Sequence, residues 1–146
     1  MGIASLLFTR CAEGVGVDMN FDYTDVNGIK RALIRVEARY GMKTGQFQAT
    51  LDTGADCCVI PMHVLKAIKA KPINTTEISD FMGNKHQKQI WQIKLIFGED
   101  VYLVECIDTE GKYGYLGLDF LKCYVWTFYP DRFEVQAFET KQLEVK

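Results

Sequence analysis

Apolar and polar residues alternate with a period of two along most of this chain, which is typical of half-buried β-strands. The alternation predicts strands over residues 15–22, 29–40 and 46–51. Apolar runs indicate strands over residues 57–60 and 101–107, and residues 125–129 and 132–138 are typical of a final hairpin. Asn27-Gly28 separates the first two of these strands and favours a tight hairpin turn. Residues 73–82 and 85–97 form two longer arms that meet at Gly83-Asn84, and their polar tip predicts a hairpin that projects from the body of the protein.

Helical spacing is confined to two short segments. Pro61 stands where a first helical residue would be, and Val64, Leu65 and Ile68 follow at the spacing of one helix face. Residues 118–123 are expected to form one or two further helical turns. Together these elements predict a small, mainly antiparallel β-barrel or sandwich with one or two short helices.

The composition is that of an ordinary globular domain, with 48% hydrophobic and 25% charged residues. A length of 146 residues favours a single domain over residues 1–146 with one proper core. Seventeen Lys and Arg against nineteen Asp and Glu give a formal charge of −2, so no nucleic acid partner is expected. No apolar run approaches the length of a membrane span, so no membrane partner is expected either.

The cysteines and the N-terminal residues indicate in which cellular compartment the protein is expected. The five cysteines are odd in number and lack Cys-x-x-Cys spacing, which favours reduced thiols over a disulfide framework or a zinc knuckle. The short apolar run within residues 1–10 has no positive residue before it, so we expect no secretory signal and predict a cytoplasmic protein. Cys57, Cys58 and His63 are of metal-ligand type. Half-buried strand residues beside a helix start are the better interpretation, and we expect neither metal nor cofactor.

The segment that carries chemistry is Asp52-Thr53-Gly54-Ala55-Asp56, directly after an apolar strand. Taken alone, Asp-Thr-Gly is also ordinary turn chemistry. Together with Leu51, the segment resembles the catalytic loop of the retropepsin-like (retroviral-type) aspartic proteases over its whole length. Two further landmarks follow in that family's order. The hairpin tipped by Gly83-Asn84 resembles the flap, and residues 115–121 resemble the closing hydrophobic segment with its glycine and short helix. The resemblance covers about residues 45–124.

The resemblance implies a small closed antiparallel β-barrel of the retropepsin type and the activity of an aspartic endopeptidase. Asp52 is then the catalytic carboxylate. The resemblance implies that Thr53 contacts its counterpart across a dimer axis. It also implies that the backbone of Gly54 passes close to the carboxyls. Ala55 is small where the substrate lies, and Asp56 orders the loop or meets the substrate backbone. The residues expected to bind substrate are Val59, Phe81, Met82, Gly83, Tyr113 and Tyr115.

A single catalytic motif per chain bears on the quaternary structure. Two carboxyls held close together cannot both ionise, so they can act as one acid and one base in amide hydrolysis. The chain has no second Asp-Thr-Gly, because Asp108-Thr109 is followed by Glu110. One Asp52 per chain forms a pair only across a two-fold axis, which predicts a homodimer that acts on a polypeptide. Two alternatives stay open: a catalytically silent dimerisation or peptide-binding module of the same fold, and a β-barrel binding module unrelated to proteases.

The chain also departs from the family pattern. Leu118 stands where many retroviral enzymes carry an arginine that pairs with the second acid of the loop. Asp56 therefore needs another partner, and an arginine of the N-terminal strand is the candidate. Tyr113 and Tyr115 replace aliphatic pocket residues, which indicates a cleft of different shape.

Overall fold

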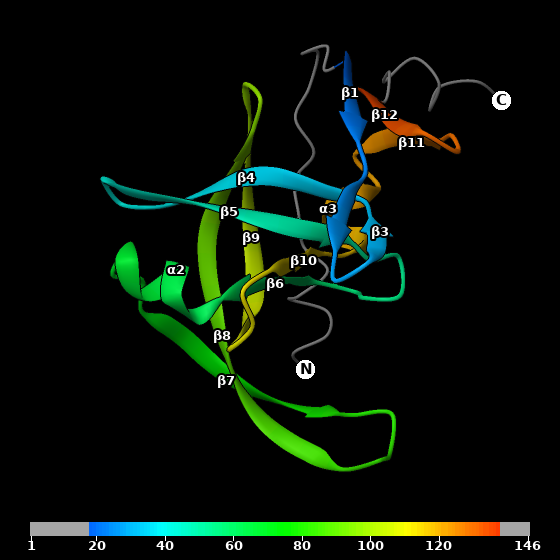
Figure 1. Ribbon diagram of the computed structural model, residues 1–146. Helices are drawn as coiled ribbons and strands as arrows, with labels where there is room; N and C mark the ends of the chain where they lie inside the picture. The colour runs from blue at the N-terminus through cyan, green and yellow to red at the C-terminus, as the bar shows by residue number, and fades with distance from the viewer. Residues whose placement is uncertain (1–17, 138–146) are drawn as a thin grey trace, which may run out of the picture.

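The computed structural model describes residues 18–137, which consist mainly of β-strands (Figure 1). Six of the strands are β4 (Leu33–Tyr40), β5 (Lys43–Leu51), β6 (Cys58–Pro61), β8 (Lys85–Phe97), β9 (Asp100–Thr109) and β10 (Gly114–Leu116). They pair in the order β4-β5-β10-β6-β9-β8, and β8 pairs back with β4, so the barrel is closed. The expected mainly-β barrel is confirmed. Most neighbours are antiparallel, but β10 runs parallel to β5, and β6 runs parallel to β9.

The remaining elements lie around this barrel. The other strands are β1 (Asp18–Asp22), β2 (Thr24–Val26), β3 (Ile29–Arg31), β7 (Pro72–Ser79), β11 (Tyr124–Phe128) and β12 (Arg132–Ala137), and the helices are α2 (Met62–Ala67) and α3 (Leu118–Leu121). β12 lies between β1 and β11 in a three-stranded sheet, and β2 pairs with β3. β7 pairs with β8 alone, and the hairpin that they form reaches away from the barrel at the bottom of Figure 1.

Alternating burial explains why the strands close on one core. Ile34 and Val36 of β4 lie opposite Ala49 and Phe47 of β5, and all four side chains are buried. Val64, Leu65 and Ile68, which share a face at helical spacing, are buried in the same cluster, so the helix predicted after Pro61 is confirmed. The other large side chains of this core include Ile60, Ile93, Leu95, Phe97, Tyr102, Leu116, Phe120 and Phe133.

Several boundaries differ from the prediction. The predicted strand over residues 29–40 is divided into β3 and β4, and the hairpin at Asn27-Gly28 joins β2 to β3. Only residues 18–22 of the first predicted strand are described, and they pair with β12 instead of with the next strand. The chain leaves β1 at Tyr23, whose hydroxyl donates to the carbonyl oxygen of Tyr129 at 2.7 Å. Residues 15–17 and 138 lie outside the described part of the chain.

A buried carboxylate ties the base of the β7–β8 hairpin to the barrel. Asp108, near the end of β9, is 8% exposed, and its Oδ1 accepts a hydrogen bond from the Trp91 indole at 3.2 Å. Its Oδ2 lies 3.6 Å from the Lys88 ammonium, which also donates to the Asp108 carbonyl oxygen at 3.1 Å. Lys88 and Trp91 lie where β8 passes from the exposed hairpin into the barrel. Asp108 therefore fixes the point from which the hairpin projects.

Replacing Asp108 tests this anchor. Asp108→Ala leaves the Trp91 N–H without its acceptor and should lower the free energy of unfolding by about 1–3 kcal/mol. Asp108→Asn should cost less, because the amide oxygen still accepts from Trp91. The measurement is urea denaturation, with Glu110→Ala as the control, since Glu110 is exposed and close in sequence. Equal effects of Asp108→Ala and Glu110→Ala would contradict the anchoring role.

Candidate active site

Asp52 begins a loop whose own backbone orients the carboxylate. It follows Leu51, the last residue of β5, and is half-buried. The Gly54 N–H donates to Asp52 Oδ1 at 2.9 Å, and the Ala55 N–H donates to the Asp52 carbonyl oxygen at 3.2 Å. A Cβ at position 54 would lie 3.3 Å from Asp52 Oδ1, which is closer than most real contacts. Glycine therefore lets the amide approach the carboxylate with little crowding.

The end of β10 and the residues after it hold the loop through backbone hydrogen bonds. The Asp52 N–H donates to the Leu116 carbonyl oxygen at 3.0 Å, and the Leu118 N–H donates to the Ala55 carbonyl oxygen at 2.8 Å. A Cβ at Gly117 would lie 2.6 Å from the carbonyl oxygen of Cys57 and 2.8 Å from that of Ala55. Both are backbone atoms, so a side chain at position 117 has no room unless the loop moves. Loop and closing segment thus form one hydrogen-bonded unit.

Asp119, the second residue of α3, is fully buried behind this loop. Its Oδ1 accepts hydrogen bonds from the Cys58 thiol at 3.3 Å and from the Phe120 N–H at 2.8 Å. The carboxylate therefore joins α3 to the strand that leaves the loop. Sequence reasoning missed this residue, although an acid between Leu118 and Phe120 in an apolar helical turn is an available signal.

The thiols beside the loop stay protonated. Burial, and second to it the charge of Asp119, raises the pKa of Cys57 to about 11. The same two causes raise the pKa of Cys58 well above its ordinary value, and burial raises that of Cys106. A thiolate nucleophile is therefore disfavoured at physiological pH. Asp52 and Asp56 carry the carboxylates on the loop itself.

The structure brings most of the predicted site residues together. Asp52, Thr53, Gly54, Ala55 and Asp56 form the loop, with Thr53, Gly54 and Asp56 exposed and Ala55 half-buried. Half-buried Val59 in β6 pairs directly with Tyr115 in β10. Tyr113 precedes β10, and the Lys112 ammonium lies 5.4 Å from the centre of its ring.

The remaining predicted residues lie at the tip of the β7–β8 hairpin. Phe81 is 99% exposed and Met82 is 74% exposed, and Gly83 has a φ of +86° in the turn. Among residues 18–137 no ion pair involves Asp56, so the expected arginine partner is not found within this part of the chain. Arg31, at the end of β3, is exposed.

The cysteines follow the prediction only in part. Cys57, Cys58 and Cys106 are free thiols, but Cys123 is disulfide-bonded, so the expectation of reduced thiols throughout is wrong at this position. Spacing along a sequence does not show which residues meet in space. Cysteine usage therefore no longer supports the cytoplasmic assignment, which stays a prediction. Over residues 18–137, no group of three or more His, Cys, Asp or Glu residues is placed to hold a metal ion. The same range holds no helix that is long and apolar enough to cross a membrane.

Comparisons with known proteins identify the architecture. No protein-family model matches this sequence, and no curated protein matches it significantly. Among solved structures, the chain is similar to the EIAV protease in complex with the inhibitor HBY-793, with 19% identity and a TM-score of 0.54 over 68% of this chain and 92% of that one. It is also similar to a retropepsin-like aspartic protease from Rickettsia conorii, with 12% identity and a TM-score of 0.58 over 89% of this chain and 94% of that one. At these identities the likeness shows the fold alone.

Adding one methyl group to the closing segment tests the unit that holds the loop. Gly117→Ala places a Cβ against two carbonyl oxygens and should lower the free energy of unfolding by about 1–3 kcal/mol, because the loop must shift. The control is Gly111→Ala, whose Cβ would have its nearest contact at 3.4 Å, from a side-chain atom of Thr109. Thermal or urea unfolding measures both. A Gly117→Ala protein as stable as Gly111→Ala would show that the contact is loose.

Proposed function

Because the chain has the retropepsin-like fold, we propose that it is an aspartic endopeptidase. Two Asp52 carboxyls, one from each chain of a homodimer, activate the water that hydrolyses a peptide bond. The observation that carries this proposal is the loop itself: Asp52 lies half-buried at its start, with the Gly54 amide on its Oδ1 and the closing segment beneath it. The EIAV protease and the aspartic protease from Rickettsia conorii share this fold, which supports the same activity here.

The need for a second carboxyl supports the dimer. Asp108-Thr109 is the nearest approach to a second motif in the sequence. Asp108 is buried and engaged by Trp91 and Lys88, so it is not available to water and substrate. A symmetric dimer supplies the missing carboxyl as a second copy of Asp52. Thr53, exposed beside Asp52, would then lie close to the axis.

The chemistry needs only these two carboxyls and water. In a close pair one carboxyl is protonated and the other is ionised. The ionised carboxyl takes a proton from water as the oxygen attacks the peptide carbon, and the protonated one gives its proton to the carbonyl oxygen. The tetrahedral intermediate then collapses: the carboxyl that took the proton from water gives it to the leaving nitrogen, the C–N bond breaks, and a hydroxyl proton of the intermediate returns to the other carboxylate. The polypeptide lies between the loop and the β7–β8 hairpin, near Val59, Tyr115 and the tip residues 81–83.

A catalytically silent module of the same fold is the second candidate. Leu118 stands where many retroviral enzymes carry an arginine, and Asp56 forms no ion pair within residues 18–137. The ion pair that would order the loop is therefore missing from that part of the chain. Such a protein would still form the dimer and bind extended peptides. Turnover separates the two candidates.

Asp52→Asn tests the catalytic role. The amide keeps the shape of the side chain but cannot act as the base, so hydrolysis should fall by at least about a hundredfold. The wild type should show a bell-shaped pH profile on the acidic side of neutrality, because activity needs one protonated and one ionised carboxyl. Asp56→Asn should reduce the rate less. The measurement is digestion of a peptide library from pH 3 to 8. Equal cleavage by wild type and Asp52→Asn would refute the assignment, and cleavage by neither would favour the silent module.

The dimer has its own test. Sedimentation of the full chain should give a species of twice the mass of one chain, with a dissociation constant that is obtained by dilution. Asp52→Asn should keep most of this association, since it changes no shape at the axis. A protein that stays monomeric at every concentration up to the millimolar range would rule out a shared pair of Asp52 carboxyls.

A further inference from the structure

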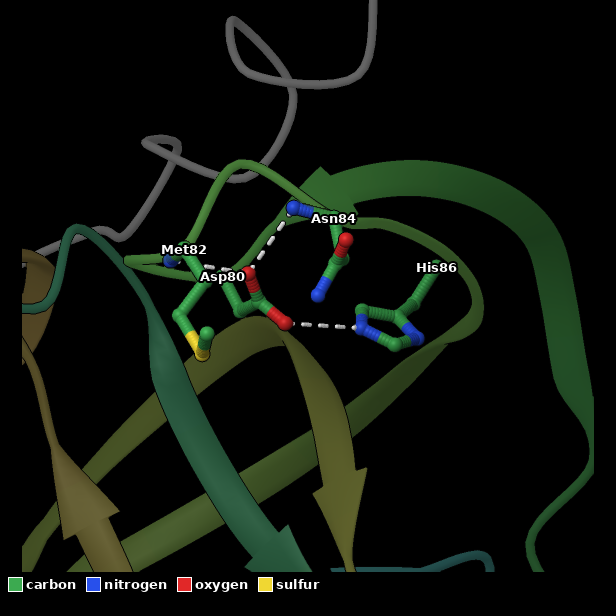
Figure 2. A network of polar contacts seen from close by, with 4 residues as sticks. All are labelled: Asp80, Met82, Asn84 and His86. Carbon is green, nitrogen blue, oxygen red and sulfur yellow. Dashed lines mark hydrogen bonds and ion pairs between the residues drawn. The ribbon is translucent and has the colours of Figure 1, made fainter.

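The tip of the β7–β8 hairpin is a preformed turn organised by Asp80 (Figure 2). Asp80 Oδ1 accepts hydrogen bonds from the N–H groups of Met82 at 3.0 Å and Asn84 at 2.9 Å. The backbone closes the same turn, because the Asp80 N–H donates to the Asn84 carbonyl oxygen at 2.9 Å and the Gly83 N–H donates to the Asp80 carbonyl oxygen at 3.0 Å. The turn therefore has one well-defined conformation.

The second oxygen of the same carboxylate is held by a histidine. His86 Nε2 lies 3.1 Å from Asp80 Oδ2, so the ring ties the turn to β8 (Figure 2). His86 pairs with Ile78 across the hairpin, next to the last residue pair before the turn, so the contact lies close to the tip. One carboxylate thus joins two backbone amides to an ionisable ring.

The turn presents two large apolar side chains to solvent. Phe81 is 99% exposed and Met82 is 74% exposed, although their backbone is fixed by Asp80. A backbone that is already held in place loses less conformational freedom when its side chains bind, so binding costs less. The arrangement fits apolar side chains of an extended peptide better than a polar ligand.

Besides Asp80, the charged residues of β7 and β8 that lie near the ring are Glu77, Lys85 and Lys88. Lys85 lies 3.8 Å from Glu77 across the hairpin, and strand alternation puts this pair on the face opposite to His86. Lys88 shares the face of His86 but is engaged by Asp108. Asp80 is therefore the charge that acts on the ring directly.

Resting on the proposed function, we propose that Asp80 and His86 are positioning residues of the flap, and that they hold Phe81 and Met82 ready for peptides with apolar side chains. The hold is strongest when Asp80 is ionised and His86 is protonated. Hydrogen bonding from the His86 ring, and after it from the Asn84 amide, lowers the pKa of Asp80 below 3.8. The stabilisation from Asp80 is therefore fully present above the ordinary pKa of an aspartate, and it is lost only as the pH falls through the lowered pKa. A neutral His86 ring cannot form the ion pair, so the hold weakens once the ring loses its proton.

The contact between Asp80 and His86 is called the clamp below. Amide hydrogen exchange at the hairpin tip tests it without substrate. NMR protection factors of the Met82 and Asn84 amides, which are corrected for the intrinsic pH dependence of exchange, are measured on the full chain from pH 4 to 8. In the wild type they should fall about two- to fivefold between pH 5 and pH 8, as expected for an exposed ion pair, and less in 1 M salt. His86→Gln should remove this fall. Lys85→Gln, the matched control on the opposite face, should keep it. The same pH dependence in His86→Gln as in wild type overturns the proposal, and so does a flat profile in wild type.

Kinetics connect the clamp to substrate. At pH 5, His86→Gln should raise KM for peptides with apolar side chains several-fold with little change in kcat, and the difference from wild type should shrink at pH 7, near the upper end of the active range. A KM effect of equal size at both values of pH would indicate a merely structural role and overturn the proposal. The exchange measurement needs no turnover. A protein that shows the clamp but hydrolyses nothing would therefore refute the proposed function and leave the clamp standing.

Discussion

The backbone of residues 116–118 lies against the loop that carries Asp52, and the geometry of the candidate site depends on that contact. Two hydrogen bonds, from Asp52 N–H to Leu116 and from Leu118 N–H to Ala55, join segments that are some sixty residues apart in the chain. The contact is possible because β10 lies between β5 and β6, and because Gly117 has no side chain to strike the carbonyl oxygens of the loop. The Asp52 carboxylate is therefore held by backbone geometry and does not depend on the missing arginine at position 118.

Local pattern predicted the parts of the fold that local chemistry determines. The alternation of Ile34 and Val36 with polar residues, the Asn27-Gly28 turn and the helical spacing of Val64, Leu65 and Ile68 each arise within a few residues, and the structure has them. β10 was not predicted as a strand, because three residues are too few to show a period. The two parallel pairings, and the closure of β8 on β4, depend on contacts between distant segments. A single sequence gives no sign of these.

The candidate site divides in the same way. The motif from Asp52 to Asp56 is contiguous, so it can be recognised in the sequence. The same holds for the polar hairpin tip, which contains Phe81 and Met82. Asp119 and Asp108 were missed because their importance comes from the partners that burial gives them: the Cys58 thiol in one case, Trp91 and Lys88 in the other. Asp108 fixes the base of the hairpin, and Asp80 orders the turn at its tip.

The central claim is that one working site is built from two chains, and the stoichiometry of a transition-state analogue tests it most directly. Such an analogue is a peptide that carries a hydroxyl-bearing tetrahedral carbon in place of the scissile carbonyl, and it should bind more tightly than the peptide itself. Calorimetric titration of the full chain at about pH 5 should give one analogue per two chains, with binding that is lost in Asp52→Asn. One analogue per chain, or equal binding by Asp52→Asn, would contradict a site shared across a two-fold axis.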